Sequence, residues 1–186
     1  EIVSVILKNN RKILIRKLEK KDVDGVWQNF NDVVSEKIFL PVYTPVFSKW
    51  EKSNWFKEMQ HGTNFCLVAI DQKQFPEKQV VGQITIEDIP WEAGDHVGQL
   101  GIIVNGAYRN QGLGYHLIQA AIKEARKIGK EKLILSTLAS NARGIHLYEK
   151  CGFTQVGCYK NQYLIIDEYI DEILMENWIG EKKAKK

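Results

Sequence analysis

The chain has 186 residues, of which 44% are hydrophobic and 26% charged, and this is enough to bury a full core as one domain. Residues 181–186 carry four lysines and one glutamate, which account for the whole net charge of +3, so the rest of the chain is formally neutral. A neutral body argues against nucleic-acid binding, and no run of about 18 apolar residues is present to cross a membrane. We expect one domain over residues 1–180 and a disordered basic tail over 181–186.

Cysteine and histidine usage indicates neither a disulfide framework nor a metal site. The three cysteines lie in apolar or strand-like surroundings without C-x-x-C spacing, and the four histidines are scattered. The N-terminus shows no signal-peptide pattern, so we expect a soluble, cytoplasmic protein that contacts no membrane. These residues are Cys66, Cys151, Cys158, His61, His96, His116 and His146.

The first elements in chain order are a hairpin and a helix. Residues 2–7 and 13–18 are β-rich runs separated by a polar turn. Residues 20–37 place apolar side chains at helical spacing and predict the first helix. Residues 39–47 contain two prolines four positions apart, which predicts an irregular loop that either folds onto the core or lines a binding cleft.

A second helix is expected from Ser48 to about His61. Ser48 is a typical N-cap, and Glu51 three residues later fits a capping box. Gly62 is expected to end the helix. The expected buried face consists of Trp50, Trp55, Phe56 and Met59.

Two strands follow, joined to a third by short links. Residues 65–70 are apolar on both alternating faces and predict a strand buried on both sides. Residues 79–89 alternate, with Gln83, Thr85 and Glu87 on the polar face. Residues 100–104 form a third apolar run, and the short links predict antiparallel neighbours.

The stretch after residue 104 joins a buried strand to a helix through a glycine-rich loop. Leu113 begins an apolar stripe at steps of three and four that extends to residue 128. The first amides of such a helix have no internal partner, and Gly112 and Gly114 keep side chains away from them, so a phosphate group could bind there. Arg109 adds a forked cation. The alternative interpretation is a tight turn with close helix packing.

The last elements complete a mixed sheet. Residues 133–138 form a strand that a helical crossover makes parallel to residues 100–104. Asn141 is the expected N-cap of a short helix that ends at Gly152. Residues 153–166 and 169–177 predict a closing hairpin.

Two motifs resemble the GNAT superfamily of acetyl-CoA-dependent N-acetyltransferases. Residues 109–114 read Arg-Asn-Gln-Gly-Leu-Gly and match the family pattern Gln/Arg-x-x-Gly-x-Gly/Ala. Residues 141–153 resemble the family pattern Asn-x-x-Ala-x-x-Leu-Tyr-x-Lys-x-Gly-Phe, with Gly144 in the place of alanine. The resemblance extends over residues 65–178. It implies an α/β (mixed α+β) fold, with a mainly antiparallel twisted sheet of about seven strands and about four helices.

The resemblance also implies a site for acetyl-CoA. In the family, the loop holds the diphosphate and the strand before it aligns the pantetheine arm and polarises the thioester. In GNAT-like chains the segment between the first two helices borders the acceptor, so Tyr43 and Phe47 are candidates for that wall. The expected cofactor-binding residues are Ile102, Ile103, Val104, Arg109, Asn110, Gln111, Gly112, Leu113, Gly114, Tyr115, Asn141 and Tyr148.

The implied reaction is direct acetyl transfer to a primary amine, and two residues are candidates for proton transfer. Asn141 and Tyr148 lie almost two helical turns apart on one face, so Tyr148 could reach the thioester and protonate the leaving thiolate. Glu87, on the polar face of its strand, is the candidate base that deprotonates the amine, directly or through water. Without the resemblance, Asn141 is a plain cap, Tyr148 a core aromatic with its hydroxyl satisfied and Glu87 a surface carboxylate.

Other functions remain open at this stage. A non-catalytic CoA-binding or protein-interaction domain would keep both motifs, and a nucleic-acid binder would use the lysine tail. The acceptor could be a protein N-terminus, a lysine side chain, an amino acid, a polyamine or an antibiotic. A homodimer is compatible with the sequence.

Overall fold

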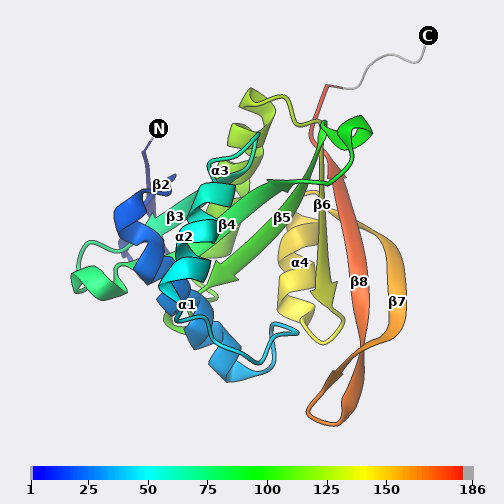
Figure 1. Cartoon of the computed structure of the whole chain (residues 1–186), viewed down its shortest axis with the longest axis horizontal. Helices are drawn as coiled ribbons and strands as arrows, with labels where there is room; N and C mark the ends of the chain where they lie inside the picture. Colours follow the sequence, from blue (N-terminus) through cyan, green and yellow to red (C-terminus); the bar gives the residue numbers. More distant parts are fainter. Residues whose placement is uncertain (1, 182–186) are drawn as a thin grey trace.

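The structure, a computed structural model, describes residues 2–181, so nearly all of the predicted basic tail lies outside the described residues. Within that range a single sheet of eight strands has the order β1-β2-β3-β4-β5-β6-β8-β7, and four α-helices flank it (Figure 1). The strands are β1 (Val3–Ile6), β2 (Lys12–Lys17), β3 (Phe65–Ile70), β4 (Val80–Asp88), β5 (Val97–Val104), β6 (Lys132–Leu138), β7 (Thr154–Ile165) and β8 (Glu168–Trp178). The α-helices are α1 (Val23–Glu36), α2 (Lys49–Glu58), α3 (Leu113–Lys127) and α4 (Ala142–Lys150). Short 3-10 turns occupy Lys20–Asp22, Pro76–Lys78, Glu92–Gly94 and Gly106–Tyr108.

The predicted fold class is confirmed. Every strand pair is antiparallel except β5 with β6, which the α3 crossover makes parallel, as the sequence indicated. The sheet has eight strands where about seven were expected. β3 is buried along its whole length. The alternation predicted for β4 is not seen in its burial, because residues 80–86 are buried except at half-buried Thr85, and the strand emerges only at Glu87. The predicted polar face is covered by α1, whose Asn29 donates a hydrogen bond to the buried Gln83. None of the helices in residues 2–181 is both long and apolar enough to cross a membrane.

The helices form a layer on each face of the sheet. α1 and α2 lie in front of the sheet in Figure 1, whereas α3 lies behind it. The larger core joins β strands to α3 and α4, with Leu117 and Ile118 fully buried beside Leu133 and Phe153. The smaller core lies under α1 and contains Val26 packed with β3 side chains. Each face of the sheet is therefore covered by its own hydrophobic core.

The central feature of the sheet is a divergence between β5 and β6. These two strands pair only from Val97 to Gln99, opposite Lys132 to Ile134. Beyond these residues β5 stays paired with β4, and β6 stays paired with β8, but β5 and β6 no longer pair with each other. The sheet therefore opens like a V. The N-termini of α3 and α4 both follow the open ends of these strands, because each helix begins shortly after its strand finishes.

The predicted buried face of α2 is wrong in part. None of the ten residues of α2 is buried, and Trp50 is 71% exposed. Met59 is buried, as expected, but lies at the end of the helix, and Trp55 is half-buried against the edge of Trp27 at 5.4 Å. The reason is that α2 lies at the edge of α1 and reaches the smaller core only through Trp55 and Phe56, which are half-buried, so no full stripe of the helix is covered. The predicted Ser48 cap is present, since its hydroxyl accepts a hydrogen bond from the Glu51 amide.

Candidate active site

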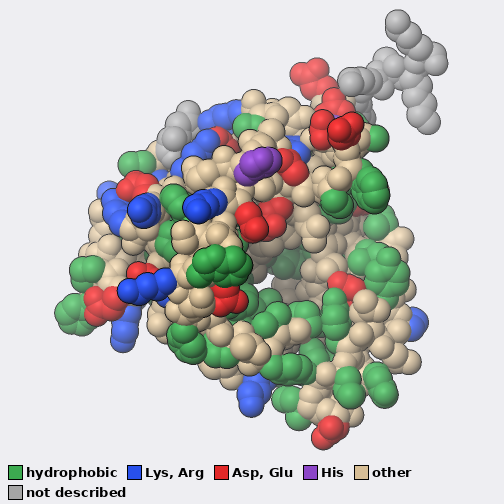
Figure 2. Space-filling view, in the orientation of Figure 1, with side chains coloured by type: hydrophobic (Ala, Val, Ile, Leu, Met, Phe, Trp, Pro, Cys, Tyr) green, Lys and Arg blue, Asp and Glu red, His purple; other side chains and the backbone are tan. Residues whose placement is uncertain are grey.

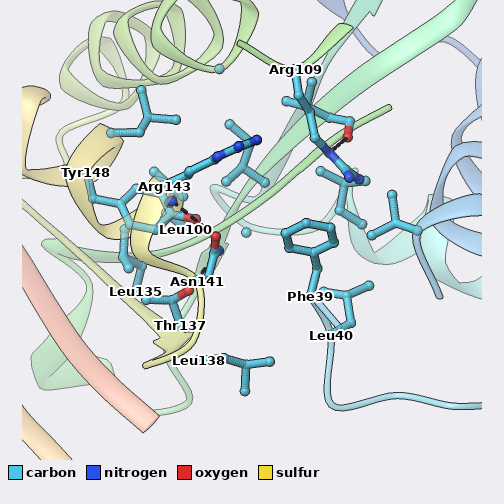
Figure 3. Close-up of a pocket in the computed structure, with 18 of the residues that line it drawn as sticks. Phe39, Leu40, Leu100, Arg109, Leu135, Thr137, Leu138, Asn141, Arg143 and Tyr148 are labelled. Atoms are coloured by element: carbon cyan, nitrogen blue, oxygen red, sulfur yellow. Dashed lines mark hydrogen bonds between the residues drawn. The ribbon is translucent and has the colours of Figure 1, made fainter. Parts of the chain in front are cut away.

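A cavity of about 430 Å³ occupies the V between β5 and β6. Its walls come from β5, the loop before α3, β6, the start of α4, the segment after α1 and the β7–β8 hairpin. Figure 2 shows the α1–α2 face hollowed near its centre, with hydrophobic and acidic side chains around the opening. Figure 3 shows Phe39 and Leu40 on one side of the cavity and Tyr148 and Leu135 on the other.

The loop before α3 presents backbone amides to this cavity. Gly112 is the N-cap of α3 with φ of 92°, a left-handed conformation that glycine adopts without steric cost, and it offers no side-chain cap. The first amides of α3 are therefore open to a ligand, and they carry partial positive charge. Gly114 serves a different purpose, because a Cβ at that position would lie 2.8 Å from Leu147 Cδ2 of α4. The interpretation as close helix packing is therefore confirmed at Gly114, and phosphate binding beside Gly112 stays a prediction.

Arg109 lies at the mouth of the cavity but is already paired. Its guanidinium donates two hydrogen bonds to the Glu36 carboxylate, at 2.6 and 2.7 Å, and Nε donates to the Val104 carbonyl at 3.0 Å. The guanidinium also lies over the Phe39 ring, 4.3 Å from its centroid. Arg109 therefore connects the loop before α3 to the end of α1 and to the segment that follows it.

A buried polar network fixes the start of the same loop. The Tyr108 hydroxyl donates to the Asp71 carboxylate at 2.7 Å and accepts from the Arg11 guanidinium at 2.7 Å. Burial raises the pKa of Tyr108, and the nearby carboxylate raises it further. Asp71 loses solvation, which opposes its ionisation, but hydrogen bonds from Tyr108, the Lys73 amide and Gln74 together with the charge of Arg11 bring its pKa below the ordinary value. The loop is thereby held in place before any ligand arrives.

Tyr148 lines the cavity with an unengaged phenol. Its side chain is 8% exposed and contacts the edge of Phe153, as a core aromatic would. Its hydroxyl, however, has no hydrogen-bond partner within the described chain, unlike that of Tyr108. Burial raises the pKa of Tyr148 to about 12, so the phenol keeps its proton at neutral pH. The sequence-based alternative, a core tyrosine with a satisfied hydroxyl, does not hold.

Asn141 is both a helix cap and a wall of the cavity. Its Oδ1 accepts from the Gly144 amide at 3.1 Å, and its Nδ2 donates to the Thr137 hydroxyl at 3.2 Å. A Cβ at position 144 would collide with the Asn141 amide, so glycine permits this cap where the family pattern has alanine. Asn141 also lines the cavity, beside Arg143 from the first turn of α4.

The structure gathers most of the sequence-predicted residues in one place. The predicted cofactor-binding residues that line the cavity are Ile102, Ile103, Val104, Arg109, Asn110, Gly112, Leu113, Gly114, Tyr115, Asn141 and Tyr148. Gln111 is not among the lining residues, and its carbonyl accepts a hydrogen bond from the Lys8 amide.

Three further candidates lie outside the cavity wall. Glu87 is exposed near the end of β4, opposite Gln99 of β5, and does not line the cavity, so its role as a base stays a prediction. Tyr43 is 54% exposed, and its hydroxyl donates to the Leu164 carbonyl at 2.8 Å. Phe47 is 71% exposed. The segment that contains Tyr43 and Phe47 does border the cavity, but through Phe39, Leu40 and Pro41.

Two of the polar residues of the cavity wall that sequence reasoning missed lie on the final hairpin. Glu172 of β8 is 8% exposed, and it accepts a hydrogen bond from the Tyr163 hydroxyl of β7 at 3.0 Å. Both residues line the cavity. The only local signal was an acidic residue within the alternating run of the final hairpin, and that pattern alone does not say which face is covered.

These features define an α/β protein with a ligand site at a divergence between two parallel strands. Residues 35–153, more than half of the chain, match the acetyltransferase (GNAT) family, and the chain belongs to that family. The resemblance that the two motifs predicted is therefore confirmed.

Individual relatives agree with the family. Over 81 residues the chain is 38% identical to [ribosomal protein bS18]-alanine N-acetyltransferase of Escherichia coli strain K12, a match that covers 44% of this chain and only about half, 55%, of that enzyme. It is 28% identical over 140 residues to an L-methionine sulfoximine/L-methionine sulfone acetyltransferase of Pseudomonas aeruginosa, covering 75% and 78% of the two chains. The crystal structure of an N-acetyltransferase from Staphylococcus aureus Mu50 matches with a TM-score of 0.81 and 25% identity, over 90% of this chain and 98% of that one.

Proposed function

We propose that this protein transfers the acetyl group of acetyl-CoA directly to a primary amine. The observation that carries the proposal is that one cavity contains both the uncapped N-terminus of α3 and the unpartnered phenol of Tyr148. Membership in the GNAT family supports it, as do relatives whose names describe acetylation of protein and small-molecule amines.

The residues around the cavity suit coenzyme A. The amides at Leu113 and Gly114 would hold the diphosphate, where the helix dipole favours negative charge. The part of β5 that lacks a β6 partner has backbone groups free to align the pantetheine arm, which is peptide-like. Acetyl-CoA supplies the activated thioester, so this chain needs no covalent nucleophile of its own. The three cysteines agree with this view, since Cys66 and Cys151 are buried and none of the three lines the cavity.

Tyr148 would act on the leaving group. The neutral amine attacks the thioester carbonyl carbon, its nitrogen releases one proton to water, and the carbon–sulfur bond breaks. Tyr148 donates its proton to the departing sulfur and is then reprotonated from water. A phenol with a pKa of about 12 is a weak acid for an ordinary thiolate. The burial that raises the pKa of Tyr148 also raises the proton affinity of a thiolate formed in the same cavity. The difference between the two proton affinities therefore changes less than the pKa of Tyr148 alone.

The amine must lose a proton before it attacks. At pH 7 this costs only about 1 kcal/mol for an α-amine, but roughly 4–5 kcal/mol for a lysine side chain. Glu87 does not line the cavity, so we expect it to take a proton from the amine through water. The geometry therefore favours amines of lower pKa, such as the α-amine of a peptide or an amino-acid derivative.

Release of the CoA thiol separates an enzyme from a binding domain. Purified protein with acetyl-CoA and a panel of amines (a peptide, a lysine derivative, an amino acid, a polyamine and an aminoglycoside) should release thiol faster than the same mixture without protein, with at least one amine. A non-catalytic CoA-binding domain would give heat with CoA in calorimetry but no release above the control. Absence of heat with CoA would exclude both functions.

A further inference from the structure

Glu172 is a buried carboxylate without a cationic partner. It is 8% exposed, and its one hydrogen bond comes from the Tyr163 hydroxyl. Across residues 2–181 no lysine or arginine pairs with it, although the other acidic residues of β8 include Asp171, which binds Lys160. A buried carboxylate normally requires a positive charge nearby, because desolvation of an isolated charge is costly. A bound cation would therefore supply the positive charge that Glu172 lacks.

The position of Glu172 places it where an acceptor would enter. It lies directly opposite Leu138 in the β6–β8 pair, so the two side chains share one face of the sheet. That face carries α1 and its following segment, whereas α3 and α4 pack on the other face. Tyr43 ties this segment to β7 through Leu164, beside the hairpin that carries Glu172. The lining residues of this half are Val33, Phe39, Leu40, Pro41, Leu138, Tyr163 and Glu172.

The charge of this half is negative and its walls are apolar. Among the described lining residues the cations are Arg109 and Arg143. Arg109 is held by Glu36 beside the loop before α3, and Arg143 comes from α4 on the opposite face of the sheet. Figure 3 shows Phe39 projecting into the cavity across from Tyr148. A ligand in this half therefore meets hydrocarbon and one carboxylate.

We propose that Glu172, held by Tyr163, receives the ammonium group of the acceptor, and that the acceptor is a primary amine with an apolar body and no carboxylate next to the amine. This inference rests on the proposed acetyl transfer. A free α-amino acid brings its carboxylate within a few bonds of the amine, where it would be repelled by Glu172 in a site of low dielectric. An amino-acid amide or a peptide N-terminus has the same amine without that charge.

The test compares L-leucinamide with L-leucine, which differ by one charge at nearly constant shape. Rates of CoA release are expressed per concentration of unprotonated amine, because the two amines have different pKa values. The wild-type protein should favour leucinamide in kcat/KM by about tenfold or more. Equal use of leucine by the wild-type protein would overturn the inference, even if no variant of Glu172 folds.

Glu172→Gln supplies the second arm. Its amide oxygen can still accept from Tyr163, so the local hydrogen bond is kept and only the charge is lost. KM for leucinamide should rise by about tenfold with a smaller change in kcat, KM for acetyl-CoA should stay constant, and the preference over leucine should shrink. Glu172→Asp should restore part of the preference. Glu168→Gln, at an exposed residue of the same strand that does not line the cavity, is the matched control and should leave the ratio unchanged.

The outcomes separate the two levels of the proposal. If no amine in the panel accelerates CoA release, the acetyl-transfer function itself fails. If transfer occurs and Glu172→Gln leaves both KM for leucinamide and the leucinamide-to-leucine ratio as in the wild type, the role of Glu172 fails while the function stands. A purely structural role for Glu172 would lower the melting temperature without altering the ratio, and this result would also overturn the inference.

Discussion

At the scale of single residues, the hydroxyls of Tyr148 and Tyr108 show that a buried phenol can either be part of the structural framework or remain open to a ligand. Both phenols are buried and both have a raised pKa. Tyr108 is bound by Asp71 and Arg11, so its hydroxyl is part of the framework that holds the loop. Tyr148 has the same burial without the partners. A buried polar group that the protein does not satisfy is one that a ligand can satisfy.

Replacement of Tyr148 by phenylalanine tests this difference. Tyr148→Phe should lower kcat by about 100-fold, the lower range for loss of a general acid. The free energy of unfolding should change by less than about 1 kcal/mol, because the variant loses no internal hydrogen bond. Thiol release, thermal unfolding and calorimetry with CoA measure the three quantities. Tyr159→Phe, on an exposed tyrosine of β7, is the control. Unchanged kcat in Tyr148→Phe would remove the residue from the chemistry.

The pH profile tests the same phenol without a mutation. Tyr148 acts in its protonated form, so its contribution is present below its pKa and is lost as pH rises through it. A pKa of about 12 moves that loss above the working range. The value of kcat/KM for the amine should therefore rise with the fraction of unprotonated amine and then stay level to pH 10. A descending limb with a midpoint below pH 10, in protein that remains folded, would contradict the raised pKa.

At the scale of elements, Arg109 links the loop before α3 to the end of α1. The arginine is the predicted phosphate ligand of the loop, but Glu36 holds both of its terminal nitrogens. To bind a diphosphate, Arg109 would have to leave the Glu36 carboxylate, and the negative charge of the diphosphate would then lie close to that of Glu36. The segment with Phe39 follows directly. We therefore expect this pair to couple cofactor binding to the shape of the acceptor half of the cavity, which is the half lined by Phe39 and Glu172.

Removal of the Glu36 charge should strengthen cofactor binding. Glu36→Gln is expected to lower Kd for CoA by about fivefold, which corresponds to the roughly 1 kcal/mol of a partly exposed ion pair. The gain should diminish at high salt, because screening weakens the competing pair. Calorimetry at two salt concentrations provides both values. Asp32→Asn, an exposed acidic residue on the same helix, should have no comparable effect. Weaker CoA binding in Glu36→Gln would show instead that the pair positions Arg109 for the phosphate.

The elements themselves were largely predictable because their signals are local. The alternation of β4, the apolar stripe of α3 and the turn glycines each lie within one short stretch of sequence. The same holds for the motif residues of the site, since Gly112 and Asn141 act through amides next to them in the chain. The error at Trp50 has the opposite origin, because the covering of α2 depends on a helix distant in sequence.

The acceptor half could not be derived from local patterns. Its wall combines Phe39, from a segment with two prolines, with Glu172, from the last strand. The pairing of β7 with β8 shifts register between Tyr159 and Tyr163, and this irregularity is what lets Tyr163 reach Glu172. Alternation in a sequence does not reveal such a shift. Gly114 is a similar case, since only the contact with Leu147 distinguishes close packing from room for a ligand.

At the scale of the whole molecule, the sheet consists of two parts that share few backbone contacts. β1 to β5 form one part and β6 to β8 the other, and only three residue pairs join them directly. The helices on the α3–α4 face complete the connection through the larger core. A ligand that fills the V would act as an additional strand partner for both parts, so its effect should be felt in the backbone on each side of the cavity.

Hydrogen exchange with and without CoA tests that view. Saturating CoA should slow amide exchange in residues 100–104 of β5, where the strand has lost its β6 neighbour, and in residues 112–115, whose amides would meet the diphosphate. It should raise the free energy of unfolding by about 2.7 kcal/mol at a concentration 100 times Kd. Residues 3–6 and 12–17, at the far edge of the sheet, serve as the internal control, because their exchange should slow only through global stabilisation. Equal slowing over the whole sheet, with no excess at β5 and the α3 N-terminus, would place the binding site elsewhere. Slowing at residues 112–115 alone would mean that the diphosphate binds as proposed while the pantetheine arm does not enter the V.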